Sequence, residues 1–288
     1  MTSTYLVDAP SLVYRAFFSY PESVTDPQGR PVNAVRGFME MVTRLVVDRR
    51  PQQLVAVFDA DWRPAFRVAA YPGYKAERPE DPASLPRQFG VIADVLDAAG
   101  VSRAESPGLE ADDVIATLVE RSVPESIVIV TGDRDLLCLI RDPDVKVMFP
   151  LKGTKDMTEY DESAVQAKYG IPPRLYGEFA TLRGDASDGL PGVAGIGPKR
   201  AADLLTRFGS IDGVMEHLDE IPARQAESFS GARAYLEAMK TVVSLVKDAP
   251  VDQTSPGAPD EDRLRALADE HNLGSSAMRL LQALRAER

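Results

Sequence analysis

The acidic residues of this chain recur where an apolar, strand-like run ends or a helical pattern begins. Nine of them form this set: Asp8, Asp59, Glu110, Asp112, Asp113, Asp133, Asp135, Asp185 and Asp188. Carboxylates that meet at one edge of a sheet raise each other's pKa, so such a cluster is normally held together by cations. Oxygen ligands suit hard cations such as Mg²⁺ or Mn²⁺, and acidic metal clusters of this kind serve phosphodiester chemistry.

Strand and helix patterns alternate from residue 4 to about residue 150, which predicts an α/β fold with a doubly wound, mainly parallel sheet. The expected strands are 4–8, 53–59, 126–131 and 145–149, and the expected helices are 12–18, 32–47, 89–99, 110–119 and 133–140. In such sheets the working crevice lies at the carboxyl ends of the strands, where Asp8, Asp59 and Asp133 stand. From about Tyr160 the pattern is helical, so we expect an α/β core over 1–159 and a helical part over 160–288.

Composition narrows the class of protein. The net charge of −11 argues against a generally basic nucleic-acid binder, but subtracting the nine acids leaves −2, which allows a local basic groove. The one cysteine, Cys138, lies in an apolar run, and the two histidines, His217 and His271, are expected at the surface. This excludes a disulfide framework and a cysteine-based zinc site. Neither a signal-peptide pattern nor a membrane-length apolar run is visible, so we expect a cytoplasmic protein.

Each acidic motif also has a purely structural explanation. Acids at 110–113 stabilise a helix N-terminus, Asp133 can cap the helix that follows it, and an Asx-turn accounts for one acid at 185–188. Asp135 counts against capping alone, because a cap needs one acid. These explanations would have to hold independently at each site, and a shared metal site accounts for all of them together.

Two further segments point to nucleic acid. The glycines of 192–197 precede a helix, so their backbone N–H groups can face a phosphate with Lys199 and Arg200 adding charge. The alternatives are a helix-turn-helix joint with Pro198 at the first helical position, and a dinucleotide fingerprint, which fits poorly because no strand precedes it.

The second segment interleaves basic and aromatic residues, as suits a single strand bound by stacking and phosphate pairing. Its members are Trp62, Arg63, Arg67, Tyr71, Tyr74, Lys75, Arg78 and Arg87. A mobile surface loop is the alternative, since prolines 72, 79, 82 and 86 interrupt the segment. Arg15, after Tyr14, is a weaker basic candidate for contacting DNA.

In combination and order these motifs resemble the 5′ nuclease family, which includes the 5′→3′ exonuclease domain of bacterial DNA polymerase I and the flap endonucleases. The resemblance covers essentially the whole chain. It rests on Leu6-Val-Asp8 with Tyr14-Arg-Ala-Phe17, Phe58-Asp59 with Phe66-Arg67, Tyr71-Pro-Gly-Tyr-Lys75-Ala-Glu-Arg78, Glu110-Ala-Asp-Asp113, Thr131-Gly-Asp-Arg-Asp135, Gly184-Asp185-Ala-Ser-Asp188 and Gly195-Ile-Gly197-Pro-Lys199. Gly189 departs from the family, which commonly has Asn at that position.

The resemblance implies that the nine acids hold two or more Mg²⁺ or Mn²⁺ ions. Lys75 and Arg78 would be catalytic residues at the base of an arch, about 60–88, through which a 5′ single strand passes. Tyr74 would lie near the scissile nucleotide. Residues 184–209 would form a helix-three-turn-helix element in which Gly195, Gly197, Lys199 and Arg200 grip duplex phosphates, with a K⁺ ion in many members.

The sequence therefore predicts a metal-dependent, structure-specific 5′ nuclease that acts as a 5′-flap endonuclease and 5′→3′ exonuclease in replication and repair. Its partners would be 5′-flap, nicked or gapped DNA and 5′ single strands, with DNA polymerase and ligase as protein partners. We expect a monomer that is either a stand-alone nuclease or the excised nuclease domain of a polymerase. A PIN-like ribonuclease and a non-catalytic DNA-binding protein are the alternatives. A haloacid-dehalogenase-type phosphatase is disfavoured, because it needs an acid where Pro10 stands.

Overall fold

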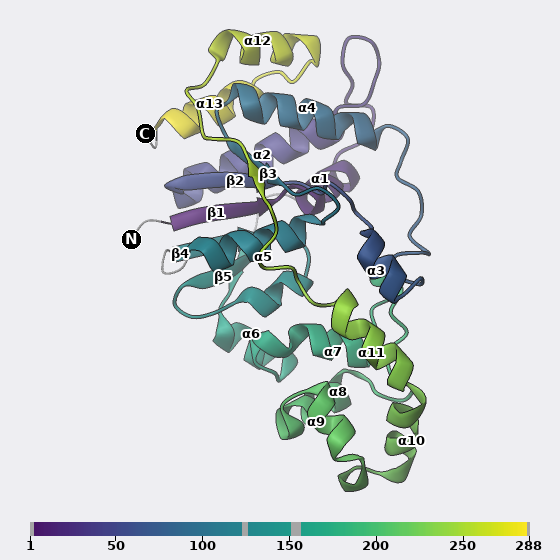
Figure 1. Ribbon diagram of the computed structural model, residues 1–288. Coiled ribbons are helices and arrows are strands. Elements are labelled where there is room, and N and C mark those ends of the chain that lie inside the picture. Colours follow the sequence, from purple (N-terminus) through teal and green to yellow (C-terminus); the bar gives the residue numbers. More distant parts are fainter. Residues whose placement is uncertain (1–2, 123–125, 151–156, 287–288) are drawn as a thin grey trace.

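The computed structural model describes residues 3–122, 126–150 and 157–286, and it shows one central sheet with helices on both faces (Figure 1). The seven strands lie in the order β6-β5-β4-β1-β2-β3-β7. Their bounds are β1 Ser3–Asp8, β2 Gln53–Val57, β3 Ser102–Glu105, β4 Ser126–Val130, β5 Val145–Pro150, β6 Met157–Tyr160 and β7 Asp252–Gln253.

The central strands run parallel, with Leu6 of β1 in register with Val55 of β2 and Ile129 of β4. Among the described strands, β6 and β7, at the two edges, are the ones that pair antiparallel with their neighbours. Helices cover both faces, which explains why these strands are continuous apolar runs. Because the strands are parallel, the residues that follow β1, β2 and β4 meet at one edge of the sheet.

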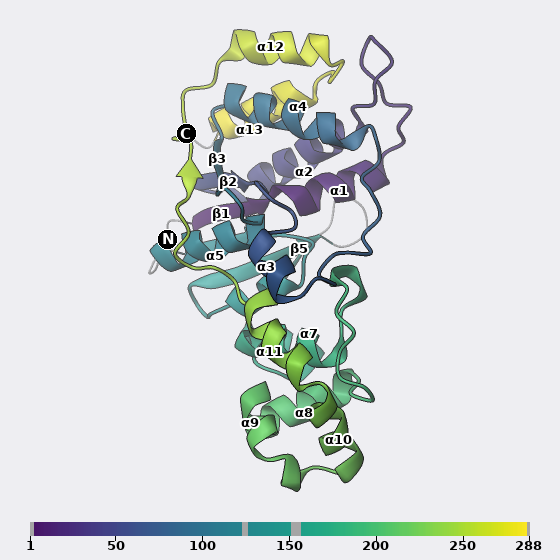
Figure 2. The ribbon, with the colours of Figure 1, turned by 45° about the vertical axis from the view of Figure 1, so that its right-hand side comes forward.

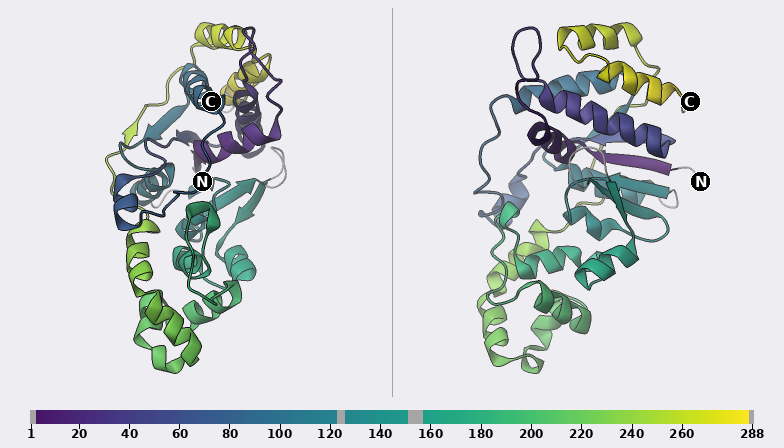
Figure 3. Two further views of the ribbon diagram at one scale, coloured as in Figure 1. Left: turned by 90° about the vertical axis from the view of Figure 1, so that its right-hand side faces the viewer. Right: turned by 180° about the vertical axis from the view of Figure 1, so that it is seen from behind.

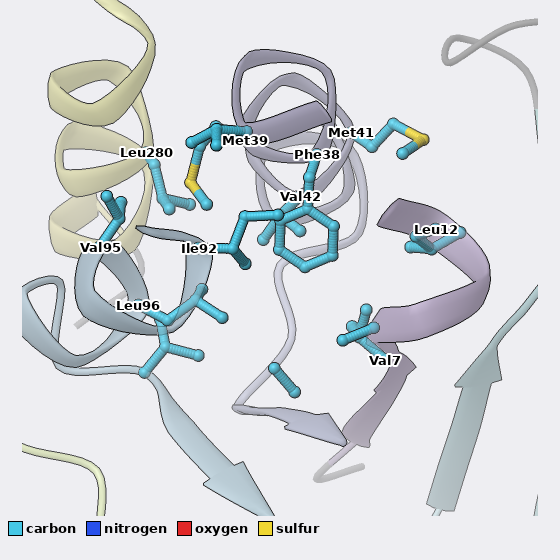
Figure 4. Packing of buried hydrophobic residues seen from close by; sticks show 14 of the residues in the cluster. Val7, Leu12, Phe38, Met39, Met41, Val42, Ile92, Val95, Leu96 and Leu280 are labelled. Carbon is cyan, nitrogen blue, oxygen red and sulfur yellow. The ribbon is translucent and has the colours of Figure 1, made fainter. Parts of the chain in front are cut away.

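One face of the sheet is covered by five helices: α1 Ala9–Ser19, α2 Asn33–Arg49, α4 Leu85–Ala98, α12 Glu261–Glu270 and α13 Ser276–Ala286. The apolar residues of α2 recur every three or four positions, which places Phe38 and Val42 on one side of the helix. There they pack with Ile92 of α4 and Leu280 of α13, all at most 1% exposed (Figure 4). Each such buried side chain contributes roughly 1.5–3 kcal/mol of hydrophobic free energy.

The other face carries α5 Ala111–Ser122 and the start of the helical part, which extends away from the sheet (Figures 1 and 3). That part contains α6 Glu162–Tyr169, α7 Tyr176–Arg183, α8 Pro198–Phe208, α9 Ile211–Glu216, α10 Ala223–Gly231 and α11 Arg233–Val242. The 3-10 helices are η1 Asp135–Leu139, η2 Pro173–Leu175, η3 Ala186–Asp188 and η4 Leu218–Glu220. After α11 the chain returns past α5 to the sheet edge and ends in α12 and α13 (Figure 2).

The predicted fold class is confirmed: a mainly parallel α/β sheet is followed by a helical part. Several details differ, including the following. Residues 133–140 form a 3-10 helix over Asp135–Leu139 instead of an α-helix. Strands β3, β6 and β7 were not predicted, because runs of two to four residues show no periodicity. Helix α4 begins at Leu85, before the expected start at 89. His271 is buried, not at the surface.

Among the described residues, no helix is both long and apolar enough to span a bilayer.

Candidate active site

A cavity of about 1020 Å³ opens at the carboxyl edge of the sheet, and eight of the nine predicted acids line it. These are Asp8, Asp59, Glu110, Asp112, Asp133, Asp135, Asp185 and Asp188. Lys75 and Arg78, the two predicted catalytic cations, lie on its wall. The structure therefore brings together side chains that lie up to 180 positions apart in the sequence.

The acids after β1 and β4 are linked by hydrogen bonds. Asp8 ends β1 and caps α1, where one of its oxygens accepts a bond from Ser11 N at 3.2 Å. Its other oxygen accepts the hydroxyl of Thr131, and the same hydroxyl oxygen accepts Asp133 N at 2.8 Å. Asp133 in turn accepts Asp135 N at 3.0 Å. Asp133 does not cap the helix that follows it, because the N-cap of η1 is Arg134 and no side chain caps this helix. Among the described residues, the bond to Asp135 N uses only one of the two Asp133 oxygens.

Burial and mutual repulsion make this edge unfavourable for free carboxylates. Burial raises the pKa of Asp8 to about 7, with the charges of Asp133 and Asp59 adding to the rise and the Thr131 bond opposing it. Burial also raises the pKa of Asp112 and of Asp135 well above the usual range, and the charge of Asp133 is the next cause for both. Bound cations would offset this repulsion and lower the pKa values of the carboxylates.

The donor set consists of carboxylate oxygens and fits hard divalent cations. In the described ranges, no three His, Cys, Asp or Glu side chains already stand close enough together to hold one metal ion. Binding would therefore need the carboxylates to draw closer, which their mutual repulsion opposes until the cation is present.

Glu110 accepts bonds from three side chains at once. Tyr74 donates its hydroxyl at 2.8 Å and Arg67 donates a guanidinium N–H at 2.6 Å to Oε2, while Lys75 pairs with Oε1. Burial raises the pKa of Glu110, and the charges of Lys75 and Arg67 oppose that rise. Glu110 is thus a carboxylate already balanced by two cations.

Three predicted site residues prove to be internal. Asp113 does not line the cavity; both its oxygens accept bonds of 2.7 Å from Arg67, which corrects its assignment as a metal ligand. Arg67 is 2% exposed, so it is not a surface contact for DNA. Tyr74 is 4% exposed and packs with Leu190 and Met239, which likewise corrects its assignment as a DNA contact.

The base of the predicted arch is an ordered part of the structure. It contains the short helix α3, Ala65–Ala70, and a series of turns at 72–77. Arg63 pins these turns by donating to the Tyr74 carbonyl at 2.6 Å and to the Pro72 carbonyl at 2.8 Å. Lys75 has a φ of 53°, a conformation that costs a non-glycine residue about 1 kcal/mol or more and persists only where surrounding contacts fix it.

The turn at 184–190 closes the cavity from the other side. Arg78 pairs with Asp188 at 2.7 Å, and Lys75 N donates to the Asp188 carbonyl at 3.0 Å. Gly189 has a φ of 71°, and a Cβ there would lie 2.4 Å from the Gly73 carbonyl oxygen. The departure from Asn at this position therefore lets the two turns approach closely.

Two arginines that line the cavity were missed by the sequence reasoning. Arg134 is exposed and lines the cavity, and its guanidinium forms no hydrogen bond or ion pair within the part of the chain that the structure describes. Arg183 also lines it and pairs with Asp185 at 3.0 Å. The signal was present, because each arginine is next to, or two residues from, a predicted site acid.

The predicted duplex grip lies outside the cavity. Gly195, Gly197, Lys199 and Arg200 are all exposed at the turn that leads into α8. Gly197 caps this helix without a side-chain hydrogen bond, so its first N–H groups are available. Arg15, the weaker candidate, is half-buried on α1 beside Gly132.

Two family models match the chain. "5'-3' exonuclease, N-terminal resolvase-like domain" matches residues 3–170, and "5'-3' exonuclease, C-terminal SAM fold" matches residues 171–261. The chain is 45% identical to a 5'-3' exonuclease of Streptomyces coelicolor, over 98% of this chain and 100% of that protein. It is 40% identical to a 5'-3' exonuclease of Mycobacterium tuberculosis, over 97% and 96%. It is also 38% identical to DNA polymerase I of the same organism, over 92% of this chain and 29% of that protein.

Solved structures share the fold at low sequence identity. The bacteriophage T5 flap endonuclease, in a pseudo-enzyme-product complex with DNA and metal ions, has a TM-score of 0.65 at 18% identity over 98% of this chain and 99% of that one. The catalytic core of Rad2 in complex with a DNA substrate has a TM-score of 0.64 at 18% identity over 100% and 93%.

Proposed function

The chain belongs to the 5'-3' exonuclease family and is a nuclease, and we propose that it is a divalent-metal-dependent, structure-specific enzyme that cuts 5′ flaps and degrades duplex DNA from the 5′ side. The observation that carries this proposal is the cavity in which eight acids face Lys75 and Arg78. Carboxylates suit the metal ions of phosphodiester hydrolysis, and cations suit the phosphate itself.

Mg²⁺ or Mn²⁺, as two or more ions, would be held by Asp8, Glu110, Asp112, Asp133 and Asp135, with Asp59, Asp185 and Asp188 holding a further ion or acting through water. Such ions activate water and stabilise the charge that develops on the phosphorus oxygens. The proposal is supported by the all-oxygen donor set and by the raised pKa values of Asp8, Asp112 and Asp135, which are caused first by burial and then by neighbouring carboxylates.

The cations of the cavity would orient the phosphodiester. Lys75 and Arg78 are paired with Glu110 and Asp188, so the substrate phosphate would compete for them once metal ions take up those carboxylates. The Arg134 guanidinium bonds no described residue, so it can pair with a phosphate without breaking a contact to any of them. Arginine presents two parallel N–H donors to a phosphate, which fixes its orientation as well as its position.

The duplex would dock on the helical part. The exposed turn before α8 offers the backbone N–H groups of Gly195 and Gly197 and the charges of Lys199 and Arg200, a combination that suits one phosphate of the backbone. A K⁺ ion at this turn belongs to the same proposal. Nicked and gapped duplexes, DNA polymerase and ligase are the proposed partners of a monomer acting in the cytoplasm in replication and repair.

An end-labelled cleavage assay tests this function. We would offer a 5′-flap duplex, a nicked duplex and a single-stranded RNA, each with Mg²⁺ or with EDTA, and map the cut. We expect the flap duplex to be cut near the base of the flap with Mg²⁺ and not with EDTA, and we expect the RNA to stay intact in both. Preferential cleavage of RNA would instead support a PIN-like ribonuclease, and binding of the flap without any cut would support a non-catalytic DNA-binding protein.

A further inference from the structure

Arg67 is a buried residue of α3, and its hydrogen bonds connect this helix to the start of α5 and to the end of α11. Its guanidinium bonds Glu110 at 2.6 Å, both oxygens of Asp113 at 2.7 Å, the Val242 carbonyl at 2.9 Å and the Ser244 carbonyl at 3.1 Å. The side chain is 2% exposed. A buried guanidinium is tolerated only when its charge is balanced and its donors are satisfied, and here both conditions are met.

One side of this junction is the end of the helical part. Val242 is the last residue of α11, so Arg67 places a positive charge at the negative end of that helix. Helix α3 lies against α11 in both views (Figures 1 and 2), and Tyr74, Leu190 and Met239 form a small core between them. The end of α11 is therefore fixed to the base of the arch.

The other side of the junction is the cavity acid. Arg67 holds Oε2 of Glu110, which leaves Oε1 to Lys75. Asp113 completes the arrangement, because it also accepts Val246 N at 2.9 Å and Glu110 N at 3.3 Å. Arg67 lies outside the lining of the large cavity, so it cannot reach a phosphate there.

We propose that Arg67 is a positioning residue, which together with Asp113 fixes the Glu110 carboxylate at the cavity and ties its orientation to the end of α11. This inference rests on the proposed nuclease function. A lysine would keep the charge but lose the planar fork, so it could not hold Glu110, Asp113 and the carbonyls at and just after the end of α11 at once.

A double-mutant cycle tests whether Arg67 acts through Glu110. Single-turnover rates would be measured in saturating enzyme and Mg²⁺ for the wild type, Arg67→Lys, Glu110→Gln and the double variant. We expect Arg67→Lys to slow cleavage about 10–100-fold, as loss of a ligand's supporting partner typically does. Flap-DNA affinity should stay within about threefold, because Arg67 touches no DNA. The double variant should be no slower than Glu110→Gln, whereas multiplied losses would overturn the proposal.

Thr117→Val is the matched control. Thr117 fastens the same returning segment to α5, through bonds of 3.1 Å to the Val246 carbonyl and 3.2 Å from Ala249 N, but it does not contact Glu110. This variant should lower the thermal midpoint and keep the wild-type cleavage rate. If it slowed cleavage as much as Arg67→Lys does, the junction would be only structural.

The single tryptophan gives a readout that needs no turnover. Trp62 is 50% exposed, and its carbonyl accepts Lys75 Nζ at 3.5 Å. Its fluorescence emission in EDTA should change in Arg67→Lys and not in Thr117→Val; an unchanged spectrum would count against the proposal.

If Arg67→Lys fails to fold, Asp113→Asn replaces it in the same cycle. A wild type that does not cut would refute the proposed function, whereas a cutting wild type with multiplied losses would refute only this inference.

Discussion

Replacing Asp8 by Asn should stabilise the metal-free protein while abolishing cleavage. The ordinary pKa of an Asp is 3.8, and in the fold that of Asp8 rises to about 7, chiefly because it is buried. Between these two values the folded chain binds a proton that the unfolded chain releases, so stability falls as pH rises through this window. Above pH 7 the ionised Asp8 costs about 4 kcal/mol, at about 1.36 kcal/mol for each pKa unit.

Asn has nearly the same shape and keeps part of the bonding. Its side-chain oxygen can still accept Ser11 N and cap α1, but its amide cannot accept the Thr131 hydroxyl. That loss is worth about 1 kcal/mol, which leaves a net gain of about 3 kcal/mol at pH 8. The gain should shrink to about 1 kcal/mol or less at pH 5, where most of the wild-type penalty is gone.

Thermal unfolding in EDTA at pH 8 and pH 5 measures this difference. A gain of about 3 kcal/mol corresponds to a rise of about 5–10 °C in the midpoint at pH 8. Asp26→Asn is the control with the opposite sign: hydrogen bonds from Arg30 and Gln28 outweigh burial and lower the pKa of Asp26 to about 2, so this variant should be less stable than the wild type at pH 8. If the unfolding midpoint of Asp8→Asn at pH 8 were equal to or below that of the wild type, the ionised Asp8 carboxylate would not destabilise the fold, and this reasoning would be refuted.

Three further outcomes are expected from the cations. Lys75→Ala and Arg78→Ala should each lower the single-turnover rate by about 10²–10³ with little change in DNA affinity; a higher dissociation constant at unchanged saturated rate would make them docking residues. Arg134→Gln should weaken flap binding and make the slope of log affinity against log salt shallower by about 1; an unaltered slope would mean that no phosphate reaches it. Lys199→Ala should do the same for every duplex regardless of sequence and leave saturated cleavage unchanged; unaltered affinity would show a purely structural turn.

The sequence alone was sufficient to predict four strands of the sheet, β1, β2, β4 and β5, and most of the acids that line the cavity. Parallel strands bring their carboxyl ends to one edge, so the acids after 4–8, 53–57 and 126–130 could be assigned to one site from their place in the pattern. The strands are long apolar runs, which makes them visible without any tertiary information. Strand β7, with two residues, is defined only by its partner β3 and could not be found in this way.

The errors at the site have a common cause. Arg67, Tyr74 and Asp113 have the residue types of a nucleic-acid or metal site, but their contacts are with each other, with Glu110 and with the end of α11. Val242 lies 175 positions after Arg67, and no local pattern reports such a contact. Whether a charged residue faces a cavity or the interior depends on tertiary packing, and so it could not be read from the spacing of charges.

The central claim is that the carboxylates of the cavity hydrolyse DNA by holding metal ions and do not bind the DNA themselves. Asp133→Asn tests it most directly, because Asp133 follows β4, lines the cavity and contacts no cation in an ion pair within the described residues. The measurement is the single-turnover cleavage of a labelled 5′ flap in Mg²⁺, with flap affinity measured in EDTA on the same preparation. The account predicts cleavage abolished and affinity within a few-fold of the wild type; near-normal cleavage by this variant would contradict it.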